Sequence, residues 1–146
     1  MITGIDDVEV IAKIHQSCFD DGWSTRSFQE MLSNNVFFGF SSKEKSTHGF
    51  ILCKKVCDEI EIITFCVLPQ FRNQGIGKSL IEAIDLYAKT HSVNLIFLEV
   101  SEDNMIAQRI YEKFGYKKIS ERKGYYRTQT YCKNAIVMLK KTDFKK

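Results

Sequence analysis

Two glycines one residue apart, Gly75 and Gly77, stand where a strand passes into a helix. The strand-like run 60–67 ends just before Pro69, the only proline of the chain, and a helical pattern of apolar residues follows the glycines. The first turn of a helix leaves backbone N–H groups without partners and carries partial positive charge. Because glycines let an anion approach these groups, the turn predicts a phosphate-binding site.

Spacing separates this turn from two common phosphate-binding motifs. A P-loop ending in residues 77–79 would need a glycine at position 72, where the chain has Arg72. A dinucleotide fingerprint beginning at Gly75 would need its third glycine at Leu80. Residues 67–77 instead follow the pattern Val-x-Pro-x-x-Arg-x-x-Gly-x-Gly. A glycine-rich turn with a purely structural role is the alternative.

Three further residues have side chains suited to acid–base chemistry or hydrogen bonding. Glu99 ends an apolar strand and could act as a general base where it is partly buried, although an exposed strand-end carboxylate is the alternative. Tyr111 lies on the apolar stripe of the next helix, and periodicity alone favours a core tyrosine. Asn104, at the start of that helix, has the position of a cap. No Ser/His/Asp or Cys/His set is evident, so covalent catalysis is not indicated.

These residues depend on an alternation of strands and helices for their placement. We expect a short strand within 1–6 and helices at 8–19 and 25–32. An antiparallel meander should follow, with strands 36–40, 49–56 and 60–67 and a polar connection at 41–47.

The second half of the chain contains a parallel crossover. A helix to about residue 91 leads to the buried strand 94–100, which should lie parallel to strand 60–67. A helix ended by Gly115 precedes strands 116–120 and 135–139, joined by the polar stretch 122–133. The fold class predicted is mixed α/β: a central, mostly antiparallel sheet with one parallel strand pair, flanked by helices.

Length and composition favour one globular domain. The chain has 146 residues, of which 44% are hydrophobic and 27% charged, and we expect a single domain at 1–140 with a Lys-rich tail at 141–146. The net charge of +3 is too small to indicate nucleic-acid binding, and no apolar run of membrane-spanning length and no signal peptide are apparent. Five cysteines without a Cys-x-x-Cys pair indicate reduced thiols and no metal site. We therefore expect a cytoplasmic protein that binds neither metal, membrane nor nucleic acid.

In its strand–turn–helix context, the run 67–77 resembles the pyrophosphate-binding motif of the GNAT N-acetyltransferases, which bind acetyl-coenzyme A. Further positions resemble one branch of that family, the RimI-like ribosomal-protein alanine N-acetyltransferases, and the resemblance extends over essentially the whole chain. The matching positions are Trp23-Ser24, Asp58-Glu59, Glu99-Val100, Asn104, Ala107, Tyr111, Gly115-Tyr116 and Tyr125-Tyr126.

The resemblance implies a GNAT fold and a role for each matching residue. Glu99 would be the general base, acting through water, and Tyr111 the acid that protonates the coenzyme A thiolate. The implied cofactor-binding residues are Phe65, Cys66, Val67, Arg72, Asn73, Gln74, Gly75, Ile76, Gly77, Lys78 and Asn104. Trp23, Tyr125 and Tyr126 would line the acceptor groove. The implied acceptor is a protein N-terminus, which in the typical member is the alanine of a small-subunit ribosomal protein.

The chain departs from the branch pattern on the acceptor side. Thr64 and Gly124 stand where the branch usually has asparagine, and Arg127 stands where it has proline. The acidic pair 20–21 could favour a cationic acceptor or be a solvated loop. Alternative acceptors are therefore a lysine side chain, a polyamine or a small-molecule amine. A non-catalytic acyl-CoA-binding module is the alternative outside enzymes.

Overall fold

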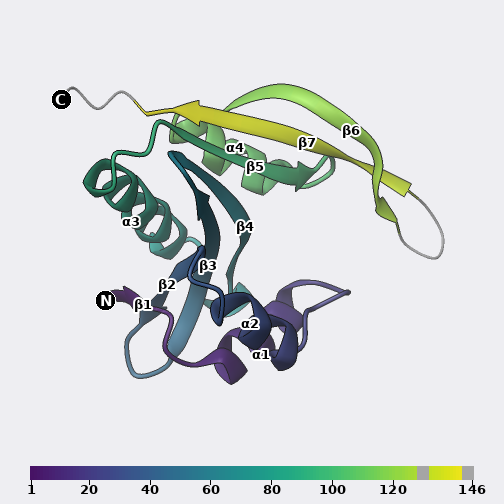
Figure 1. Cartoon of the computed structure of the whole chain (residues 1–146). Helices are drawn as coiled ribbons and strands as arrows, with labels where there is room; N and C mark the ends of the chain where they lie inside the picture. Colours follow the sequence, from purple (N-terminus) through teal and green to yellow (C-terminus); the bar gives the residue numbers. More distant parts are fainter. Residues whose placement is uncertain (128–131, 143–146) are drawn as a thin grey trace.

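The computed structural model describes residues 1–127 and 132–142, with the side chains of 125–127 and 132–133 also outside the description. One seven-stranded sheet has the order β1-β2-β3-β4-β5-β7-β6 (Figure 1). The strands are β1 (Ile2–Gly4), β2 (Phe37–Lys43), β3 (Thr47–Val56), β4 (Glu59–Val67), β5 (Leu95–Ser101), β6 (Lys117–Arg127) and β7 (Cys132–Lys141). The helices are α1 (Val8–Cys18), α2 (Thr25–Leu32), α3 (Ile76–Thr90) and α4 (Met105–Lys113), with a 3₁₀ turn η1 (Pro69–Phe71) after β4.

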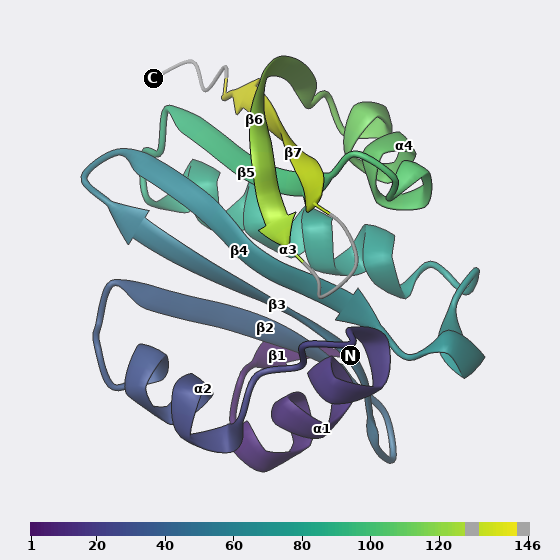
Figure 2. The same ribbon diagram turned by 90° about the vertical axis from the view of Figure 1, so that its right-hand side faces the viewer.

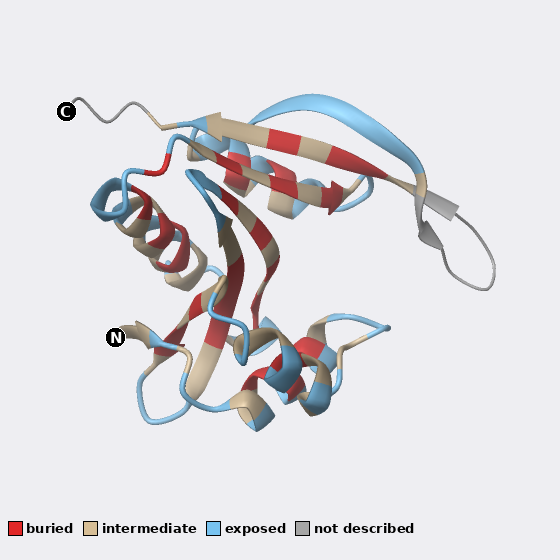
Figure 3. Ribbon diagram, viewed as in Figure 1, coloured by how far each residue is buried: buried red, intermediate tan, exposed pale blue. Residues whose placement is uncertain are grey.

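Helices cover both faces of the sheet and enclose two apolar clusters (Figures 1 and 2). On one face, Phe28 of α2 and residues of α1 pack against Phe50 and Leu52 of β3. On the other face, α3 and α4 pack over residues of β3, β4, β5 and β7. Buried positions accordingly follow the strands and the helix faces turned towards them (Figure 3). No helix in the described ranges is long and apolar enough to cross a membrane.

The predicted fold class and the predicted order of elements are confirmed. Of the adjacent strand pairs among described residues, β4–β5 is parallel and the others are antiparallel. The predicted helix starts are also correct: Asp7 Oδ1 accepts a hydrogen bond from Val10 N at 3.2 Å, and Ser24 Oγ accepts one from Ser27 N at 3.1 Å. Gly115 follows α4 in the left-handed conformation, as expected for a residue that ends a helix.

Two predicted connections are shorter than expected, because strand residues extend into both of them. The stretch 41–47 belongs mostly to β2 and β3, since Ser41 and Ser42 are buried and paired with β1 on one side and β3 on the other. The stretch 122–133 is likewise shortened, because β6 continues to Arg127 and β7 begins at Cys132. Lys141, the first residue of the predicted tail, ends β7 opposite Leu95, and Thr142 N donates a hydrogen bond to the Asn94 carbonyl at 3.0 Å, whereas residues 143–146 lie outside the description.

Candidate active site

The sheet opens between β4 and β5. The two strands pair only from Glu59–Leu95 to Ile62–Leu98, although β4 continues to Val67 and β5 to Ser101. A β-bulge interrupts the pairing of β4 with β3 at the same level. Cys53 of β3 pairs with Ile62 and Leu52 pairs with Thr64, so the register shifts by one residue between these two pairs. Beyond this bulge the strands diverge (Figure 2). In the described sheet, the β5-facing edge of residues 63–67 therefore has no partner strand, and such an edge can pair with an extended ligand.

The predicted phosphate turn follows directly from this open edge. Asn73 and Gly75 adopt left-handed backbone conformations, with φ of 63° and 83°. Gly75 is the N-cap of α3 and supplies no side-chain hydrogen bond, whereas α1, α2 and α4 are capped by Asp, Ser and Asn side chains. Among the described helices of eight residues or more, α3 thus begins with N–H groups that no side chain caps. That is the arrangement which favours an anion.

Arg72 and Gly77 fix the turn against β4. Arg72 Nε donates a hydrogen bond to the Val67 carbonyl at 2.9 Å, which ties the turn to the end of the strand. A Cβ atom at Gly77 would lie 3.0 Å from the Phe65 ring, so the helix packs closely on that side chain. The structure therefore brings the predicted cofactor-binding residues 65–67 and 72–78 together.

Glu99 lies on β5, on the other side of the opening. Its side chain is 18% exposed, and Arg122 Nη1 of β6 donates to its carboxylate at 2.5 Å. A second carboxylate, Glu61 of β4, is close by. Burial raises the pKa of Glu61, and the negative charge of Glu99 raises that pKa further.

Sequence reasoning missed both Glu61 and Arg122. A charged residue inside the apolar run 60–67 was the available signal for Glu61. No sequence signal links Arg122 to Glu99, because the two strands are separated in the sheet by β7.

Tyr111 is a core residue whose ring approaches Phe65 of β4. It is 4% exposed, and its ring centroid lies 6.0 Å from that of Phe65 and 5.4 Å from that of Tyr116. Asn104 is the N-cap of α4, where its Oδ1 accepts a hydrogen bond from Ala107 N at 3.1 Å. The interpretations from periodicity and cap position, core for Tyr111 and cap for Asn104, are both confirmed.

The predicted acceptor residues come from two separate elements. Trp23 lies in the α1–α2 loop and stacks on His15 at 4.6 Å between ring centroids. Tyr125 and Tyr126 belong to the backbone of β6, but their side chains lie outside the description. Gly124, just before them, has a φ of 67°, a conformation that glycine and asparagine both tolerate. Gly124, which stands where the resembling branch has asparagine, can therefore adopt the same backbone conformation.

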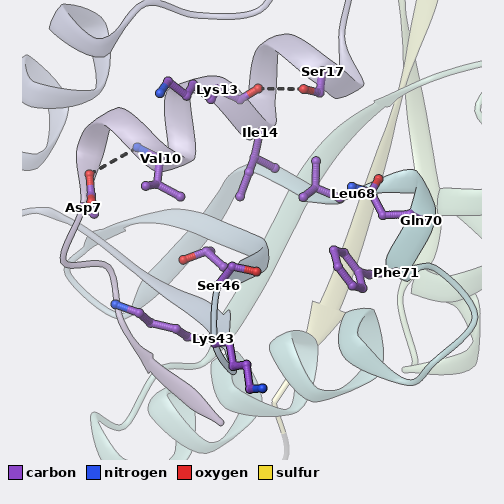
Figure 4. Close-up of a pocket in the computed structure, with 12 residues that line it drawn as sticks. Asp7, Val10, Lys13, Ile14, Ser17, Lys43, Ser46, Leu68, Gln70 and Phe71 are labelled. Carbon is purple, nitrogen blue, oxygen red and sulfur yellow. Dashed lines mark hydrogen bonds between the residues drawn. The ribbon is translucent and has the colours of Figure 1, made fainter.

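One pocket of the described structure lies away from these residues. A space of about 620 Å³ is bordered by α1, the β2–β3 turn and η1, with Lys13, Lys43 and Phe71 among its lining residues (Figure 4). None of the predicted catalytic or acceptor residues lines it. The residues predicted for catalysis are therefore found at the β4–β5 opening and not at this pocket.

Comparison with known proteins identifies the family. The Acetyltransferase (GNAT) family matches residues 8–116. The ribosomal protein bS18-alanine N-acetyltransferase of Haemophilus influenzae is 35% identical over 91 residues, 62% of each chain. Its Escherichia coli K12 counterpart is 25% identical over 132 residues, 90% of this chain and 89% of the relative.

The same fold occurs in solved structures. The crystal structure of the ribosomal-protein-S18-alanine N-acetyltransferase from Escherichia coli superposes with a TM-score of 0.92 at 23% identity, covering 100% of this chain and 96% of that one. With three quarters of the sequence matched to one family, the chain belongs to the GNAT acetyltransferases.

Proposed function

We propose that this enzyme transfers an acetyl group from acetyl-CoA to the N-terminal amine of a protein, with the alanine of ribosomal protein bS18 as the favoured acceptor. The observation that carries the proposal is the β4–β5 opening, which has an uncapped helix N-terminus at its entrance and the carboxylate of Glu99 on its far wall. The names of the relatives support the acceptor, and a ribosomal acceptor would place the reaction in the cytoplasm.

The residues of the opening fit an extended acyl carrier that ends in a pyrophosphate. The free edge of residues 65–67 offers backbone N–H and C=O groups to a pantetheine chain, and N–H groups of 73–78 suit the two phosphates. Lys78 adds a positive charge, and Asn104 contributes its amide from the start of α4. When bound, acetyl-CoA supplies an acetyl group as a thioester that an amine can attack.

Acetyl transfer needs a neutral amine, a stabilised oxyanion and a protonated leaving group. Glu99, held by Arg122, accepts the amine proton through a water molecule. Backbone N–H groups of 65–67 polarise the carbonyl oxygen. Tyr111, buried beside Phe65, donates the proton that the departing thiolate requires.

The acceptor would enter on the face of the sheet that carries Glu61 and Glu99. These carboxylates lie close enough for the charge of one to raise the pKa of the other, and a protonated N-terminus placed beside them would offset that repulsion. Trp23 and the tyrosine pair 125–126 remain the residues predicted to contact the peptide.

Two peptides that differ only at their N-terminus test this function. Both begin with alanine and contain one internal lysine, and one of them has a blocked N-terminus. Coenzyme A release only with the free terminus would support the proposal, and the N-terminal peptide of bS18 should then be the best acceptor. Equal release with both peptides would assign a lysine acceptor. No release from a protein that still binds acetyl-CoA would contradict N-terminal acetylation.

A further inference from the structure

Two thiols that the proposed mechanism does not use lie at the end of β4. Cys18 is the last residue of α1 and is half-buried, and Cys66 of β4 is buried. Both belong to the apolar cluster between α1, α2 and the sheet. Cys18 Sγ lies 3.6 Å from the carbonyl oxygen of Val67, the residue that follows Cys66, and its protonated form donates a hydrogen bond to that oxygen. The pair therefore borders the open edge of the cofactor strand.

A guanidinium group stabilises the negative charge of one of these thiols. Arg72 Nη2 lies 3.9 Å from Cys18 Sγ, while Nε of the same side chain binds the Val67 carbonyl. The hydrogen bond from Cys66, and then Arg72, lower the pKa of Cys18 to about 6, although burial opposes them. The same hydrogen bond and burial raise the pKa of Cys66. Of the two thiols, Cys18 is therefore the one that ionises more readily.

Exposure and charge separate the roles of the two sulfurs. Cys18 is partly exposed and ionises more readily than Cys66, and exposure and thiolate character are the two properties of an oxidant-sensitive thiol. Cys66 lies behind it, protected from solvent, in the position of a second thiol that can react with the oxidised first one. Cys57 is exposed in the β3–β4 turn and gives a matched comparison.

We propose that Cys18 is a site of oxidation by hydrogen peroxide, and that Cys66 converts the product into an intramolecular disulfide. The Cys18 thiolate attacks one peroxide oxygen, so that an S–O bond forms, the O–O bond breaks and hydroxide leaves as water after taking a proton. Cys18 is thereby oxidised to a sulfenic acid and the peroxide is reduced. The Cys66 sulfur then attacks the Cys18 sulfur and loses its proton, and the S–O bond breaks with release of a second water.

The disulfide would change the strand that the proposed function assigns to the cofactor. It would join the end of α1 to the residue before Val67 and would remove the thiolate that faces Arg72. Because Arg72 also holds the Val67 carbonyl, the turn and the strand end should both shift. This consequence rests on the proposed function, and we expect the oxidised protein to bind coenzyme A about fivefold more weakly.

Thiol counting tests the modification without reference to activity: the folded protein is treated with peroxide, and its thiols are alkylated after unfolding, so that buried cysteines also react. Hydrogen peroxide should lower the number of alkylatable thiols by two from the original five, and peptide mapping should identify a Cys18–Cys66 bond that dithiothreitol reverses. Cys57→Ser should form the same bond, whereas Cys18→Ser should not. Cys66→Ser should accumulate a sulfenic acid at Cys18, detectable with a dimedone probe. Arg72→Gln should react several-fold more slowly.

Five thiols remaining after treatment, or a disulfide that involves Cys57, would overturn the proposal. A Cys18–Cys66 bond that leaves the dissociation constant of coenzyme A unchanged would overturn its link to the cofactor strand. Failure of the untreated, reduced protein to bind coenzyme A would instead contradict the proposed function.

Discussion

Acid should destabilise this protein through His15. The side chain is 4% exposed and lies between two polar groups: Trp23 N–H donates to Nδ1 at 3.0 Å, and Nε2 lies 3.1 Å from Thr64 Oγ1. Because Nδ1 accepts a hydrogen bond, the neutral ring carries its proton on Nε2 and donates to Thr64. A second proton, on Nδ1, would replace this acceptor by a donor that faces the backbone N–H of Trp23. Burial accordingly lowers the pKa of His15 from 6.5 to about 4.

The sign and size of the effect follow from that shift. As the pH falls below 6.5, the unfolded chain binds a proton at this position before the folded chain does, so the free energy of unfolding decreases. The contribution of neutral His15 is complete above pH 6.5 and is lost as the pH falls to about 4. Linkage gives a loss of ~2 kcal/mol at pH 5 and ~3 kcal/mol below pH 4.

Urea unfolding at pH 7 and at pH 5, followed by circular dichroism, measures this difference. His15→Gln removes the titrating group, so the wild-type protein should lose ~2 kcal/mol more than this variant between the two pH values. His91→Gln, which changes an exposed histidine at the end of α3, should keep the wild-type dependence. An equal pH dependence in the wild type and His15→Gln would refute the assignment of a depressed pKa to His15.

Three substitutions test the opening itself. Glu99→Gln should lower kcat by ~100-fold with an unchanged dissociation constant for coenzyme A, because only proton removal is lost; an unaffected kcat at neutral pH would exclude Glu99 as the base. Tyr111→Phe should also lower kcat by ~100-fold and change cofactor affinity much less, and a normal kcat would leave Tyr111 with a core role alone. Gly75→Ala places a Cβ in open space but at a φ of 83°, so it should lower the free energy of unfolding by ~1 kcal/mol, measured by thermal unfolding, and should weaken coenzyme A binding. Gly4→Ala also adds a Cβ in open space but without a positive φ, and it should change neither quantity.

The parts of the fold with local signals were predictable. Asp7, Ser24 and Gly115 mark helix ends through hydrogen bonds and backbone conformations that involve only near neighbours in sequence. Pro69 and the glycine pair similarly place the phosphate turn between β4 and α3. These features do not depend on how distant strands pair, and residues 60–77 therefore suffice to predict the cofactor side of the proposed site.

Features set by distant pairing were not predictable. Ser41 and Ser42 look like a polar connection, but β1 pairs with them and buries both. The polar residues 121–127 likewise do not look like a strand in the sequence, but they extend β6 through its pairing with β7, which comes later in the chain. The same limit applies to Glu99, because its ion pair with Arg122 exists only once β5, β7 and β6 lie side by side.

The acceptor side shows how such distant pairing bears on function. Thr64 departs from the asparagine of the resembling branch, yet it lies directly after the β4 bulge and binds His15, 49 residues away in the sequence. His15 also holds the Trp23 backbone and stacks on its ring. One buried, neutral histidine thus connects the strand proposed for the cofactor to the loop proposed for the acceptor. A change at position 64 should therefore alter acceptor preference through the position of Trp23, even where it leaves the thioester contacts of residues 65–67 intact.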